Sequence, residues 1–313
     1  MYLLDLTSRK QKGKCQVSSG AVDGLRQPAP LLIRFVGSKS ILLTMTRSFQ
    51  GLFHRSVYST LWLLGFLFLS AAVALPAAAQ EAVPTQVTVR AVSNDAKLIQ
   101  DPVGGARITI EDAETGAVLA EGRQTGDSGS TEKIMRRPHE RGATIYDVLG
   151  AAKYETTLDL ERPTRVKITA EGPLGYPHAM QTATKTTLLM PGEDVTGDGI
   201  TLTLHGFIVE VMEPSASDVA PGEEVTVRAR VRMMCGCPTE PGGLWNSNRY
   251  TIQAQLLRDG TVVAEAPLSF AGTTNEYDGP LTVPDGGATE VRVTATDADR
   301  ANFGMGTASL TGE

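Results

Sequence analysis

Short runs of alternating apolar and polar residues restrict the fold of this chain more than any other feature of its sequence. In residues 85–92, for example, Val87, Val89 and Ala91 recur at every second position, and Gly, Pro, Asp and Asn separate one run from the next. A period of two places one face of a strand in a core and the other in water, and helical periodicity is almost lacking. The pattern predicts an all-β protein.

The predicted strands form two consecutive groups. They are residues 85–92, 106–112, 118–123, 154–160, 164–171, 183–190 and 200–205, followed by 207–212, 224–234, 250–258, 261–270, 291–296 and a short strand near Ala308. No linker separates the groups, and the boundary falls near Gly206. We therefore expect two tandem antiparallel β-sandwiches, residues 80–205 and 206–313, each long enough to bury its own core.

Several short motifs lie in the first group. They are a Pro-x-x-Gly-Ala start, a Thr-Gly hairpin, a Thr-x-x-x-Gly turn and a Gly-Tyr pair, formed by Pro102, Gly105, Ala106, Thr115, Gly116, Thr125, Asp127, Gly129, Gly175 and Tyr176. With these motifs the first half resembles the carboxypeptidase-regulatory-like, or transthyretin-like, β-sandwich domains. The resemblance implies a binding or spacer module rather than a catalytic one.

Residues 130–153 depart from that family's pattern as an insertion. The insertion is basic, with Lys133, Arg136, Arg137, His139 and Arg141. Such a run either binds an anionic ligand or acidic partner or forms a solvated loop.

The second group resembles bacterial immunoglobulin-like domains. Residues 219–231 (VAPGEEVTVRARV) are similar to the opening of those sandwiches, and residues 293–304 (VTATDADRANFG) to their last hairpin. This resemblance implies a fold and not an activity.

An uncharged apolar run at residues 61–75 precedes both groups. Arg47 and Arg55 lie before it, and Pro76 and three alanines ending at Ala79 follow. A spanning helix needs about 20 apolar residues, so the order of basic flank, apolar run and small residues indicates a cleaved signal peptide. We expect translation to start at Met45, residues 1–44 to be an upstream extension, and residues 45–79 to be removed. The product would be soluble, without membrane insertion, and periplasmic or secreted.

Removal of residues 1–79 makes the protein markedly acidic. The whole chain carries a formal charge of −6, whereas the remaining residues hold 20 Lys and Arg against 33 Asp and Glu, a net charge of −13. Such a surface repels phosphate backbones and anionic lipid headgroups. The charge argues against a nucleic acid partner but does not name one, and an envelope protein or a glycan stays open as a partner.

The two cysteines that follow the signal peptide lie in the segment Met233-Met234-Cys235-Gly236-Cys237. On a strand, Cys235 and Cys237 point to the same face, and Gly236 lets the backbone bend so that the sulfurs converge. Three outcomes are open: a structural disulfide, a soft-metal site, and a redox pair that exchanges disulfides with a partner.

The soft-metal hypothesis assigns copper to this segment. Thiolates beside thioethers suit Cu(I), with Cys235 and Cys237 as thiolate ligands and Met233 or Met234 as the thioether. Alternation allows only one of the two methionines to share a face with the cysteines, and core burial is the usual role of Met. Trp245 would either shield the site or fill the sandwich core. Zinc is a poorer choice, because no His lies near the cysteines in the sequence.

Other candidate sites lack part of the required pattern. Residues 194–199 (DVTGDG) match half of a calcium loop, but His205 stands where a bidentate Glu belongs, and an Asp-rich turn near Asp297 is ordinary turn chemistry. His139 and His178 lie in no catalytic motif. We therefore expect no enzyme activity. The sequence predicts an exported, non-catalytic envelope protein that binds copper, or alternatively a structural or adhesion-type scaffold with a Cys235–Cys237 disulfide.

Overall fold

A computed structural model describes residues 81–215 and 219–310. The upstream extension, the signal peptide and its cleavage site, predicted over residues 1–79, lie outside the described residues. Within the two described ranges, no helix is both long and apolar enough to span a bilayer.

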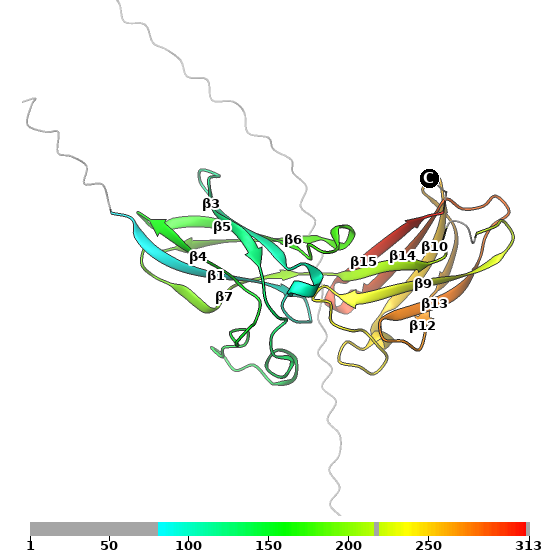
Figure 1. Cartoon of the computed structure of the whole chain (residues 1–313), viewed down its shortest axis with the longest axis horizontal. Coiled ribbons are helices and arrows are strands. Elements are labelled where there is room, and N and C mark those ends of the chain that lie inside the picture. The colour runs from blue at the N-terminus through cyan, green and yellow to red at the C-terminus, as the bar shows by residue number, and fades with distance from the viewer. Residues whose placement is uncertain (1–80, 216–218, 311–313) are drawn as a thin grey trace, which may run out of the picture. The chain divides into compact units, whose positions relative to one another are not determined.

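The first sandwich is built from seven strands in two sheets. One sheet has the order β4-β1-β7, from β4 (Tyr154–Leu160), β1 (Val83–Ser93) and β7 (Val195–Leu204). The other has the order β3-β2-β5-β6, from β3 (Val118–Gln124), β2 (Ala106–Asp112), β5 (Thr164–Gly172) and β6 (Gln181–Leu189) (Figure 1). All pairs are antiparallel except β1 with β7, which run parallel.

The core of the first sandwich follows the predicted alternation. Val87, Val89 and Ala91 of β1 are each at most 1% exposed and belong to one cluster with Ile108 of β2 and Ile168 of β5. Residues from both sheets therefore fill one core, as a period of two requires.

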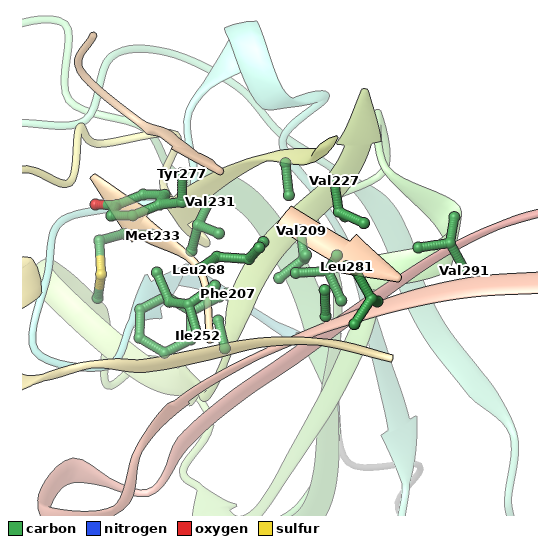
Figure 2. Packing of buried hydrophobic residues seen from close by; sticks show 14 of the residues in the cluster. Phe207, Val209, Val227, Val231, Met233, Ile252, Leu268, Tyr277, Leu281 and Val291 are labelled. Carbon is green, nitrogen blue, oxygen red and sulfur yellow. The ribbon is translucent and has the colours of Figure 1, made fainter. Parts of the chain in front are cut away.

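The described part of the second sandwich has eight strands, again in two sheets. One sheet has the order β12-β13-β9-β8, from β12 (Ser269–Phe270), β13 (Glu276–Thr282), β9 (Glu224–Met233) and β8 (Phe207–Glu213). The other has the order β11-β10-β14-β15, from β11 (Thr261–Pro267), β10 (Thr251–Arg258), β14 (Glu290–Asp297) and β15 (Asn302–Ser309). Figure 2 shows the apolar side chains of this core, among them Phe207, Met233 and Tyr277. The predicted all-β class with two tandem sandwiches is confirmed.

In residues 81–215 and 219–310, helical structure is limited to short turns between strands. These are η1 (Asp101–Val103), η2 (Glu132–Arg136), η3 (Pro177–Ala179), η5 (Ser247–Arg249) and η6 (Ala298–Arg300).

Two strands of the second sandwich differ from the prediction. The single strand expected over 261–270 is two strands in different sheets, because the chain crosses between the sheets after Pro267, where the Leu268 amide donates to the Ile252 carbonyl. Strand β13 was not predicted, since Gly279 and Pro280 interrupt its pattern. Proline is tolerated there because β12 pairs with β13 only as far as Asp278.

Neighbouring leucines at the end of β6 test the alternation directly. Leu189 is 2% exposed in the first core, whereas Leu188 is 51% exposed. Leu189→Ala should lower the free energy of unfolding by about 2–5 kcal/mol through lost burial and a residual cavity. Leu188→Ala should change it by less than about 0.5 kcal/mol. Urea unfolding of both variants gives the comparison, and equal effects would contradict this register.

Candidate functional site

The cysteines lie in a tight hairpin directly after β9. The Met233 amide donates to the Cys237 carbonyl at 3.1 Å, and the Gly236 amide donates to the Met233 carbonyl at 2.7 Å. The Cα atoms of Cys235 and Cys237 are 5.3 Å apart and their sulfurs form a disulfide. Gly236 adopts φ +78°, a left-handed conformation that favours glycine.

The two methionines of the segment enter different cores. Met233 belongs to the second core, together with Cys235 and Cys237, and its sulfur accepts a hydrogen bond from the Tyr250 hydroxyl at 3.7 Å. Met234 belongs to the first core. The structure therefore brings three of the four predicted ligand residues into one core and sends the fourth to the other.

The hairpin is closely packed against the first sandwich. The Gln100 side-chain amide donates to the Cys235 carbonyl at 2.8 Å. A Cβ added to Gly236 would lie only 2.7 Å from a methyl carbon of Val103, a residue of η1. Position 236 therefore requires glycine for its conformation and also for its contact with Val103.

Trp245 lies in the same core as the cysteines. Its ring is buried, and the indole N–H donates to the Asp95 carbonyl at 3.0 Å. Trp245 thus fills the sandwich core, and its one polar atom binds the turn that follows β1.

Charged groups gather where that turn meets the second sandwich. Asp95 pairs with Arg249 at 3.3 Å and with Arg300 at 2.6 Å. Asp297, whose side chain is 3% exposed, pairs with the same two arginines at 3.1 and 3.9 Å. Two carboxylates therefore share two guanidinium groups, an arrangement in which each buried charge is paired.

Two asparagines complete this arrangement. The Asn94 side chain donates to the Arg300 carbonyl at 2.6 Å, and the Asn302 side chain donates to the Asn94 carbonyl at 3.3 Å. Asn302 also accepts the Gly206 amide at 3.0 Å. We call this set the polar joint; its members are Asn94, Asp95, Arg249, Asp297, Arg300 and Asn302. The Asp-rich turn of the sequence thus forms part of a contact between sandwiches.

Arg232 makes a second contact between the sandwiches. Its guanidinium pairs with Glu210 at 2.6 Å, donates to the Tyr176 hydroxyl at 2.8 Å and lies 4.9 Å from the centre of the Tyr176 ring. A cation over an aromatic face adds to the attraction.

The carboxylates of the calcium-like segment bind backbone amides. Asp198 accepts the N–H groups of three consecutive residues, Ile145 at 2.7 Å, Tyr146 at 2.7 Å and Asp147 at 2.8 Å. Asp194 accepts the Gln86 amide at 2.8 Å. Donors directed at a carboxylate occupy the lone pairs that a cation would need. Both aspartates therefore hold chain segments in place.

The insertion covers the outer face of β1. Arg90, on that face, is fully buried; it donates to the Ala152 carbonyl at 2.8 Å and pairs with Asp147 at 2.9 Å. Val92 packs beside it in a small third cluster with Ala151. The second half of the insertion is therefore part of the folded domain.

A polar groove lies beside this covered face. Its volume is about 810 Å³, and its lining comes from β3, β4 and the end of the insertion, including Arg123, Lys153 and Tyr154.

The histidines His139 and His178 lie outside this groove. A ring nitrogen of His139 donates to the Lys133 carbonyl, and one of His178 donates to the Val209 carbonyl. No group of three or more His, Cys, Asp and Glu side chains in the described ranges is placed to hold a metal ion.

Compared with models of known protein families and with curated protein sequences, the chain matches none. The candidate site therefore has to be judged from its own geometry.

Removal of the Asp297 carboxylate tests the polar joint. Asp297→Ala leaves Arg249 and Arg300 with one carboxylate in place of two, and should cost about 1–3 kcal/mol of unfolding free energy, because both arginines are partly solvated. Asp299 is exposed on the same turn, and Asp299→Ala should cost less than about 0.5 kcal/mol. Thermal unfolding of the two variants makes the measurement, and a silent Asp297→Ala would rule out a stabilising joint.

Tyr250, whose hydroxyl donates to the Met233 sulfur, gives a test of this site at alkaline pH. Burial raises the pKa of Tyr250 to about 12, opposed by Arg249 and supported by Asp297 and Asp95. Because the folded pKa exceeds the unfolded value near 10, the folded state favours the protonated phenol of Tyr250. The stability that this preference contributes is complete below about pH 10 and is lost as the pH rises towards 12. Tyr250→Phe keeps the ring and removes the ionisation. Its unfolding free energy should fall less between pH 9.5 and 12 than that of the wild type, by about 1–2 kcal/mol after solvent screening. If the unfolding free energies of the variant and the wild type fell equally with pH, a raised pKa of Tyr250 would be contradicted.

Proposed function

We propose that this chain is an exported, non-catalytic scaffold protein of the cell envelope that binds a protein or glycan partner through its sandwiches. The observation that carries the proposal is the position of the Cys235–Cys237 hairpin. Both sulfurs are bonded to each other in a buried setting, and the Cys235 carbonyl is held by Gln100 of the first sandwich. A buried disulfide in such a hairpin is suited to fixing structure.

The expected compartment supports the same role. Disulfides persist in secreted and periplasmic proteins and are rare in the cytosol, and residues 45–79 have the composition of a signal peptide. Cys235 and Cys237 are separated by two positions in the sequence, so the small ring that they close removes little chain entropy from the unfolded state. Its contribution is to fix the hairpin that contacts Val103 and Gln100.

The resemblance of the first sandwich supports a binding or spacer role. Its strands form a three-stranded and a four-stranded sheet, which accommodates the carboxypeptidase-regulatory-like or transthyretin-like assignment. The second sandwich, with four strands in each sheet, accommodates the immunoglobulin-like assignment. Modules of both kinds serve as rigid supports for binding surfaces, and function then depends on the particular surface.

One observation favours copper binding as the second candidate. Met233 belongs to the same core as Cys235 and Cys237, so reduction of the disulfide would provide two thiolates in a core that also holds one thioether, a set that suits Cu(I). Met234 belongs to the other core and would stay outside such a site. The copper hypothesis therefore needs a reductant, and it retains three ligands, Met233, Cys235 and Cys237.

Mass measurement of the protein purified from the periplasm distinguishes these two functions. The scaffold proposal expects a mass two hydrogens below the reduced value and no bound metal. The reduced protein is then titrated with Cu(I) against a competing chelator, with Cys235→Ser/Cys237→Ser as the control. Free thiols in the purified protein, together with tight Cu(I) binding that the control lacks, would overturn the scaffold proposal in favour of copper.

A further inference from the structure

The first half of the insertion carries a group of exposed cations that the proposed scaffold does not use. We call residues 133–141 the basic arch. Its cationic or titratable side chains are exposed to solvent; they are Lys133, Arg136, Arg137, His139 and Arg141. The arch lies in the looped segment between β3 and β4 (Figure 1).

The arch is held firmly where it begins. Ile134 is 7% exposed, and its amide donates to the Ser130 carbonyl at 2.9 Å in the helical turn η2. Met135 packs against the second core. The Arg137 amide closes the turn on the Glu132 carbonyl at 3.1 Å. Two apolar side chains and a helical turn therefore fix the direction in which Arg136 and Arg137 leave the surface.

The segment after the arch is anchored as well. Asp198 binds the three consecutive amides of residues 145–147, and Tyr146 packs against the small third cluster. Arg90 binds the Ala152 carbonyl from beneath. A loop fixed on both sides loses less conformational freedom when it binds a partner than a free loop does.

The charge of the arch opposes that of the protein. Residues 133–141 hold four Lys and Arg and one Glu, within a mature chain of net charge −13. Glu132 is the partner of Arg136 at 4.0 Å and of Arg137 at 3.3 Å. Within the described ranges, Lys133 and Arg141 form no ion pair. The arch thus presents more positive charge than Glu132 and Glu140 neutralise.

We propose that the basic arch is a docking site for a short carboxylate-rich segment of a partner protein; this inference rests on the proposed binding role. Three arginines within six positions favour planar carboxylates, which a guanidinium binds in a bidentate manner. The acidic surface outside the arch disfavours a long polyanion, because only a short stretch of it could contact the cations without repulsion. A brief run of Asp or Glu on a partner protein fits both conditions.

Fluorescence anisotropy with a labelled octaglutamate peptide tests the docking site, with an octaglutamine peptide as the neutral probe. The purified wild-type protein should bind octaglutamate at low salt, release it at about 0.3 M salt, and ignore octaglutamine. Arg136→Ala/Arg137→Ala/Arg141→Ala should weaken binding about tenfold or more. The matched control, Arg107→Ala/Arg162→Ala/Arg165→Ala, removes three exposed arginines elsewhere on the first sandwich and should change the affinity less than about twofold.

Each alternative result has a definite meaning. Equal losses in the two triple variants would overturn the docking site, because binding would then depend on total charge. Binding of dextran sulfate at the arch without binding of octaglutamate would overturn the choice of a protein partner and assign the arch to an anionic glycan. Failure of wild-type protein to bind octaglutamate would also overturn the inference. An intact disulfide in the same sample would leave the scaffold proposal standing.

Discussion

Two carboxylates that share two arginines join the two sandwiches at the polar joint. Asp95 comes from the turn after β1 and Asp297 from the end of β14, so the two acids would repel each other without Arg249 and Arg300. Because Asp297 is almost fully buried, loss of its partners would leave a charge that water cannot stabilise. The hydrogen bonds of Asn94 and Asn302 join the same turns, and the Trp245 indole N–H donates to the Asp95 carbonyl beside them.

The same principle organises the insertion. Arg90 is buried on the outer face of β1, and its two terminal nitrogens donate to carbonyl groups and to Asp147, whereas its Nε has no hydrogen-bond partner among the described residues. Asp198 binds three amides of the insertion. One cation and one anion thus fix a segment that breaks the strand pattern. Arg90 is buried and Asp198 is half-buried, and their hydrogen bonds to neighbouring polar groups offset much of the cost of removing the two charges from water. A segment held in this way can present the basic arch in a fixed orientation.

Strand alternation made most of the fold predictable, and the limits of the prediction have physical causes. Most strands were predicted within a few residues, because their apolar faces repeat with period two. β13 escaped, since Gly279 and Pro280 break that pattern. Alternation also indicated that only one methionine could accompany the cysteines. The core that receives Met234 depends on packing between sandwiches, which a local pattern does not encode. Arg249, one of the two partners of Asp297, lies 48 residues away in the sequence, so a local pattern does not indicate that pair either.

The crossing from β11 to β12 has a consequence for how the protein avoids unwanted association. β12 pairs with β13 at only two positions, so no described strand pairs with β13 on that side beyond Asp278. An open edge of this kind is a template on which another chain can add a strand. Pro280 lies within the unpaired stretch and has no N–H to offer an incoming strand. The proline that obscured β13 in the sequence thus removes a hydrogen-bond donor from the edge on which another chain would pair.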